Sequence, residues 1–148
     1  MSIIYLDTSA LLKLYIQEKQ SADVSTLLET ADGAGTSILT YTEMASAMAR
    51  AARMRLISDN EAKSAWGNFL HDWPEFTRLK ISAQLTEHAA SLAWELGLRG
   101  YDAMHLAAAL TWQDALETPI CLATFDRLLW GAGQKAGITI WPETMTPG

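Results

Sequence analysis

The strongest constraint on the fold is a short apolar run, residues 3–6, that ends abruptly at the polar triplet Asp7, Thr8 and Ser9. An uninterrupted apolar run of this length is typical of a strand that is buried on both faces. The polar triplet is a typical helix start, so the strand is predicted to lead directly into a helix. Strands joined through helices favour a parallel sheet, because parallel neighbours need a crossover connection.

The same alternation continues along the chain. An apolar stripe at residues 11–16 predicts the first helix, and a second helix over residues 21–31 is expected to end at the segment Asp-Gly-Ala-Gly, residues 32–35. Further helices are predicted at residues 40–56, 58–73, 86–96, 101–116 and 126–136, and further strands at residues 36–39, 76–81, 119–124 and 138–141. We therefore expect an α/β fold, in which a central parallel sheet of four to five strands is flanked by helices.

Length and composition limit the class of protein. The chain has 148 residues, of which 49% are hydrophobic and 19% charged, so it has the length and the apolar content of one folded domain. No stretch approaches the roughly 18 apolar residues that a membrane helix needs. The N-terminal apolar run lacks a basic segment before it and is not a secretory signal. A single cysteine, Cys121, fits a reducing, cytoplasmic location.

The charge balance restricts how the protein could bind nucleic acid. The formal net charge is −6, so the chain has no overall positive field to attract a polyanion. A nucleic-acid substrate would need a local basic patch or a bound metal ion. The one basic cluster, which includes Arg50 and Arg53, is a candidate RNA-binding patch, although a solvated helix face explains it equally well.

Acidic residues recur where the predicted strands end. Asp7 follows the first strand directly, Glu43 lies a few residues past the second, and Asp126 follows the strand near residue 124. Asp102 lies in the first turn of a predicted apolar helix. Since ligands of such sheets bind beyond the carboxyl ends of the strands, these four acids are candidate site residues at one edge.

Taken singly, each acid also suits a helix terminus. Asp7 is a preferred N-cap residue, the segment from Thr40 to Glu43 matches a capping box, and Asp102 and Asp126 suit the positive end of a helix dipole. Together, four carboxylates at one edge would repel one another unless a cation screened them. Oxygen ligands without a Cys/His cluster favour Mg²⁺ or Mn²⁺ over zinc. Capping and metal binding both remain open at this point.

Four segments carry a resemblance to a known family: residues 5–13, 42–43, 101–109, and 122–129 followed by 136–138. In this order and spacing, the chain resembles the PIN-domain nucleases and, within them, the VapC-like toxins of bacterial toxin–antitoxin modules. The resemblance implies a PIN-like nuclease domain, which we place at residues 1–142, and the prolines at 142 and 147 predict a loose tail over residues 143–148. It also implies a Mg²⁺- or Mn²⁺-dependent endoribonuclease that hydrolyses RNA phosphodiester bonds with a metal-activated water, and a small cognate antitoxin that inhibits it.

The resemblance also assigns roles to residues. The acidic metal-binding and catalytic positions of the family fall on Asp7, Glu43, Asp102 and Asp126, and its hydroxyl position before the last acid falls on Thr124. Some relatives have a further acid two or three residues past the last one, where this chain has Leu128 and Leu129. One tightly held metal ion is therefore expected, and a second is doubtful.

Other residues have two interpretations each. His105 shares a helical face with Asp102, yet a core histidine is favoured over an acid–base role because no triad spacing accompanies it. Thr8 and Ser9 could cap a helix or hydrogen-bond the acids. Lys13 and Arg99 are isolated cations that could join the rim of a site, and the six dispersed tryptophans indicate packing in the core or in a homodimer.

Three other functions compete with the nuclease interpretation. A receiver-like phospho-switch also places acids and Mg²⁺ at a parallel sheet edge, but it needs adjacent acids after the first strand, and Thr8 follows Asp7 here. The haloacid-dehalogenase plan needs an aspartate at the position of Ser9. A PIN-like module that binds RNA or protein without catalysis remains a third possibility, although all four acids are present.

Overall fold

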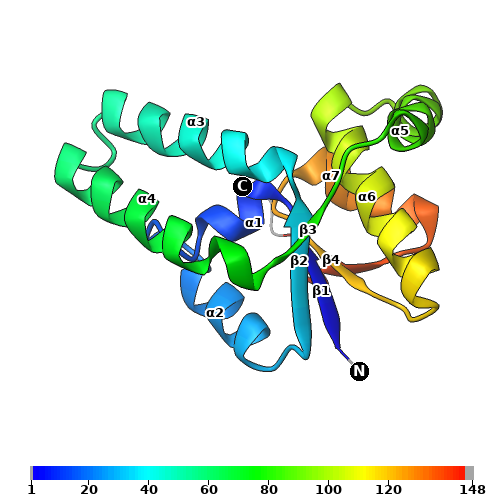
Figure 1. The fold of residues 1–148 in the computed structure, drawn as a ribbon, viewed down its shortest axis with the longest axis horizontal. Coiled ribbons are helices and arrows are strands. Elements are labelled where there is room, and N and C mark those ends of the chain that lie inside the picture. Colours follow the sequence, from blue (N-terminus) through cyan, green and yellow to red (C-terminus); the bar gives the residue numbers. More distant parts are fainter. Residues whose placement is uncertain (1, 146–148) are drawn as a thin grey trace.

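The computed structural model describes residues 2–145, and it has the predicted α/β architecture. Five parallel strands form one sheet in the order β3-β2-β1-β4-β5, with β1 at its centre (Figure 1). The strands are β1 (Ile3–Leu6), β2 (Gly33–Ser37), β3 (Thr77–Leu79), β4 (Cys121–Ala123) and β5 (Thr139–Trp141). The prediction of a parallel sheet flanked by helices is confirmed. The end of the predicted loose tail, residues 146–148, lies outside the described residues.

The helices lie on both sides of the sheet. They are α1 (Thr8–Leu12), α2 (Ser21–Glu29), α3 (Leu39–Arg53), α4 (Asp59–Asp72), the short 3₁₀ helix η1 (Trp73–Glu75), α5 (Ala83–Leu96), α6 (Gly100–Leu116) and α7 (Arg127–Ala136). Figure 1 shows α3 and α4 as a pair of antiparallel helices that extends to one side of the sheet, with α5, α6 and α7 on the other side. No helix within residues 2–145 is long and apolar enough to cross a membrane.

The central strand β1 is buried on both faces, as its apolar run predicts. Ile3 and Tyr5 belong to the core beneath α5, α6 and α7, whereas Ile4 and Leu6 belong to the core beneath α1 to α4. Side chains alternate between the faces of a strand, so four consecutive apolar residues serve two cores at once. The strand is thereby fixed in position, and so is Asp7, the next residue.

The second strand lies earlier in the chain than the sequence suggested. We expected residues 32–35 to end the preceding helix and residues 36–39 to form the strand, but β2 is Gly33–Ser37. The helix α6 explains the difference, because a Cβ atom at Gly35 would lie 2.7 Å from the ring of Trp112. The glycine therefore allows a tryptophan to lie against the strand, which is a tertiary requirement that glycine's usual preference for turns conceals.

The start of one helix and the end of another also differ from expectation. The helix α3 begins at Leu39 with Ile38 as N-cap and no side-chain cap, so the predicted capping box from Thr40 to Glu43 does not form. Thr40 is buried, and its hydroxyl pairs with that of Thr36 at 2.7 Å. The apolar stripe up to residue 16 is only partly helical, because α1 ends at Leu12 and turns follow.

Candidate active site

Asp7 lies at the carboxyl end of β1 and is almost fully buried. Its carboxylate accepts three hydrogen bonds: from the backbone N–H of Ala10 at 3.0 Å, from Ser9 Oγ at 2.7 Å and from Thr124 Oγ1 at 2.6 Å. The bond from Ala10 makes Asp7 the N-cap of α1, so the capping interpretation is correct for this residue. Burial raises the pKa of the Asp7 carboxyl, although the bonds from Thr124 and Ser9 oppose that shift. A buried carboxylate with a raised pKa is unusual for a residue whose only role is a helix cap.

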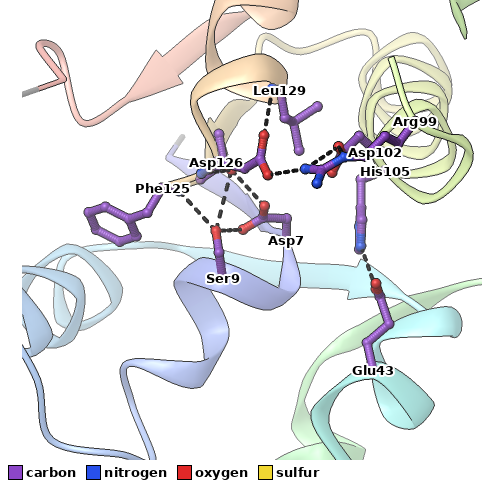
Figure 2. Close-up of polar contacts among 10 residues, drawn as sticks. Asp7, Ser9, Glu43, Arg99, Asp102, His105, Phe125, Asp126 and Leu129 are labelled. Atoms are coloured by element: carbon purple, nitrogen blue, oxygen red, sulfur yellow. Dashed lines mark hydrogen bonds and ion pairs between the residues drawn. The ribbon is translucent and has the colours of Figure 1, made fainter. Parts of the chain in front are cut away.

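Thr124 joins two of the acids. It lies just beyond β4, is fully buried, donates to Asp7 and accepts from the backbone N–H of Asp126 at 3.0 Å. Ser9 adds a second connection, since its Oγ accepts from the N–H of Phe125 at 2.9 Å while donating to Asp7. These bonds hold the ends of β1 and β4 in a fixed relation, as Figure 2 shows.

Asp126 and Asp102 face each other across one arginine. Asp126 caps α7 by accepting from the N–H of Leu129 at 3.1 Å, and Asp102 lies in the first turn of α6. Arg99 Nη2 lies 2.5 Å from Asp126 Oδ2 and 2.9 Å from Asp102 Oδ2, and Arg99 Nε donates to Asp102 at 3.0 Å (Figure 2). Burial and the charge of Asp126 raise the pKa of the Asp102 carboxyl despite this arginine. Sequence analysis expected Arg99 only as a cation that could join the rim of a site, and the pairing with Asp126, 27 positions away, was not predicted.

Glu43 is held by a hydrogen-bond chain that begins in the core. Tyr5 Oη lies 2.7 Å from His105 Nδ1, and His105 Nε2 lies 2.8 Å from Glu43 Oε1. Thr8 Oγ1 donates to the same Oε1 at 2.7 Å. Burial opposes ionisation of Glu43, but hydrogen bonding to His105 and Thr8 lowers the pKa of its carboxyl below the usual value. Neither bond involves Oε2, so a second carboxylate oxygen remains for a ligand.

His105 is a further candidate site residue, although sequence analysis favoured a core position without a functional role. The expected core location is correct, because its side chain is only 2% exposed. Burial keeps the Tyr5 hydroxyl protonated by raising its pKa, so this hydroxyl can donate to Nδ1, while an N–H at Nε2 can donate to Glu43. The sequence shows that His105 lies three residues after Asp102, but its hydrogen-bond partner Glu43 lies 62 positions away in the chain.

The donor set fits a hard divalent cation. Asp7, Glu43, Asp102 and Asp126 come from the carboxyl edge of the sheet and the adjoining turns of α3 and α6, and they offer only oxygen. Within residues 2–145, no group of three or more His, Cys, Asp or Glu side chains lies in a ready metal-binding arrangement. Mg²⁺ does not require three protein ligands, because one or two carboxylates commonly hold it together with several waters. The raised pKa values of Asp7 and Asp102 mark carboxylates that a cation would stabilise.

The other predicted positions lie elsewhere. Arg50 and Arg53 are exposed in the last turn of α3, at the end that Figure 1 shows pointing away from the sheet, so the structure does not bring them to the acids. Leu128 is exposed and Leu129 is buried in the core, and neither supplies the further acid found in some relatives.

The family assignment agrees with this geometry. A family model described as the PIN domain matches residues 4–129. The chain belongs to the PIN-domain family. The resemblance drawn from the four segments is thereby confirmed, and the receiver-like alternative is wrong.

Similar proteins extend the comparison to the whole chain. Ribonuclease VapC45 of Mycobacterium tuberculosis (strain CDC 1551 / Oshkosh) is 33% identical over 147 residues, covering 99% of this chain and 100% of the relative. Among solved structures, PAE2754 from Pyrobaculum aerophilum aligns with a TM-score of 0.63 and 21% identity over 94% of this chain and 83% of that one. A toxin–antitoxin complex from Klebsiella pneumoniae contains a chain that aligns with a TM-score of 0.55 and 17% identity, over 83% of this chain and 88% of that one. At these identities, the solved structures show a shared fold.

Proposed function

We propose that this PIN domain is a cytoplasmic endoribonuclease that depends on Mg²⁺ or Mn²⁺ and acts as the toxin of a toxin–antitoxin pair. The observation that carries the proposal is the convergence of Asp7, Glu43, Asp102 and Asp126 at one sheet edge, each held by named hydrogen bonds or ion pairs. Full-length similarity to proteins named Ribonuclease VapC supports the choice of RNA as substrate.

The four acids would hold the divalent ion directly or through water. When bound, the ion would supply positive charge for the scissile phosphate and favour ionisation of the attacking water. That charge matters in a protein of net charge −6, which otherwise repels RNA.

The neighbouring residues would position the acids. Thr124 and Ser9 fix the Asp7 carboxylate through hydrogen bonds to both of its oxygens. His105 and Thr8 bind only Oε1 of Glu43, which leaves Oε2 to receive a ligand or a proton. Such prior fixing of charged groups lowers the reorganisation that catalysis requires.

Cleavage of RNA by the purified chain tests this function. We expect total RNA to be cut in Mn²⁺ or Mg²⁺, the cutting to stop in EDTA, and Asp7→Asn to lose activity by orders of magnitude. Mapping of the new RNA ends would identify the sequence or structure that is cut. Cleavage that persists in EDTA would refute the metal-dependent mechanism, and RNA binding without cleavage would favour the non-catalytic PIN-like module.

The antitoxin is expected to be a small protein with a basic, partly apolar segment, because the site and the whole chain are acidic. Co-expression with the product of a neighbouring gene should restore the growth of cells that express this chain. If no such product binds the chain or restores growth, the toxin assignment fails. We also propose a homodimer, which sedimentation of the purified chain would test.

Arg50 and Arg53, in the last turn of α3, remain proposed RNA contacts. Single Arg50→Ala and Arg53→Ala variants should weaken RNA binding more than turnover at saturating substrate, since phosphate contacts mainly position the strand. Each lost contact should reduce the salt dependence of binding. An unchanged salt dependence would assign both arginines to an ordinary solvated helix face.

A further inference from the structure

Arg99 is the one cation within residues 2–145 whose side chain forms ion pairs with two of the candidate site acids. Its guanidinium lies between Asp102 and Asp126 and is bonded to both, as Figure 2 shows. These carboxylates are two of the four that would hold the divalent ion. A metal ion and Arg99 would therefore compete for the same oxygens, Oδ2 of Asp102 and Oδ2 of Asp126.

The Arg99 side chain is more exposed to solvent than the side chains of the two acids that it pairs with. Its side chain is 50% exposed, whereas that of Asp102 is 3% exposed and that of Asp126 is 24% exposed. The guanidinium also lies 4.9 Å from the ring centroid of Tyr101, which is itself partly exposed, so an aromatic surface outside the acid pair already contacts it. The side chain can leave the carboxylates without exposing core residues, whereas the acids themselves cannot move in this way.

The backbone at Arg99 does not depend on its side chain. Arg99 is the N-cap of α6, but its side chain makes no capping bond, and its carbonyl accepts from the N–H of Ala103 at 3.0 Å. Any residue can supply that carbonyl. The position of the arginine side chain is therefore explained by the two acids and not by the helix start.

We propose that Arg99 is a displaceable internal counter-cation: it bridges Asp102 and Asp126 while no divalent ion is bound, and it moves to bind a substrate phosphate when the ion takes its place. This inference rests on the proposed function, because it assumes a metal site and a nucleic-acid substrate. An arginine guanidinium suits phosphate through its fork of donors. Displacement would thus prepare substrate binding at the moment when the metal site is filled.

Metal binding in the absence of RNA tests the first half. Titration of the metal-free protein with Mn²⁺ should show that Arg99→Ala binds the ion about three- to tenfold more tightly than the parent, because the competing cation is gone. Lys135→Ala is the matched control, since Lys135 is exposed in the last turn of α7 while Asp126 caps the first turn, and it should leave the Mn²⁺ affinity within about twofold. Thermal melting without metal checks that both variants are folded.

RNA binding tests the second half. In Mn²⁺, Arg99→Ala should bind a 2′-O-methylated single-stranded oligonucleotide more weakly by fluorescence anisotropy, and its salt slope should fall by about 0.7, the value for one phosphate contact. The two expected effects have opposite signs, with tighter metal binding and weaker RNA binding. A purely structural role for Arg99 would weaken both.

Each contrary result has a distinct meaning. If Arg99→Ala binds Mn²⁺ no more tightly than the parent, the arginine does not compete with the ion and the inference is overturned. An unchanged RNA salt slope overturns the phosphate-binding role. If none of the three proteins binds Mn²⁺, the metal-dependent function itself fails and the inference fails with it.

Discussion

The replacement of Thr124 by valine tests the hydrogen bonding at the sheet edge most directly. Valine has the shape of threonine, so the substitution removes the hydroxyl and leaves the fully buried packing at this position in place. It deletes the 2.6 Å bond to the Asp7 carboxylate and removes the acceptor for the N–H of Asp126.

The magnitude follows from these two bonds. A hydrogen bond to a charged group contributes about 1.5–3 kcal/mol to the free energy of unfolding, and a buried donor left unpaired costs about 1–3 kcal/mol. The Asp126 amide is only partly buried, so we take the low end for it and expect a total loss of about 3 kcal/mol. For a chain of this size, that corresponds to a decrease in melting temperature of about 6–12 °C.

The assay is denaturation by heat and by urea in EDTA, at several pH values, with Thr124→Ser as the control. Serine keeps the hydroxyl and loses one methyl group, at a cost of about 1 kcal/mol. The bond from Thr124 stabilises the ionised form of Asp7, so the difference between the valine and serine variants should shrink as the pH falls through the raised pKa of Asp7. Equal stability of the two variants at pH 7 would refute this account of Thr124.

Three further predictions test the electrostatics and the packing. Asp102→Asn should melt at a higher temperature than the parent in EDTA at pH 7 but not near pH 4. Burial and the charge of Asp126 raise the pKa of Asp102, so the parent loses stability as the pH rises through that pKa. A lower melting temperature of the variant at pH 7 would contradict this. Gly35→Ala should lose about 1–3 kcal/mol in a urea titration, because its Cβ would meet the ring of Trp112 at 2.7 Å; an unchanged midpoint would show that the tryptophan moves freely. Burial raises the pKa of the Cys121 thiol to about 11, so its alkylation by iodoacetamide at pH 8 should be far slower than that of free cysteine, and an equal rate would disprove the burial argument.

The class of fold and the sheet edge at which Asp7 and Asp126 lie could be predicted from the sequence. The apolar run before Asp7 required a strand buried on both faces, and that strand is at the centre of the sheet. Because all strands are parallel, their carboxyl ends lie at one edge of the sheet, which places Asp7 and Asp126 on the same edge. The two acids are neighbours because β1 pairs with β4 in the structure. Local chemistry also fixed the helix starts at these two acids, since both are N-caps.

The hydrogen bonds and ion pairs that hold the acids depend on tertiary contacts. Glu43 and His105 are 62 positions apart, and Arg99 and Asp126 are 27 apart, so no local pattern could pair them. The strand at Gly35 was misjudged for the same reason, because the ring of Trp112 that requires a glycine belongs to α6. Hydrophobic periodicity encodes which face of each element is buried, whereas side-chain partners depend on how α6 packs across the sheet against β1, β2 and α3. That packing is set jointly by many distant residues, and it therefore becomes visible only when the chain is folded.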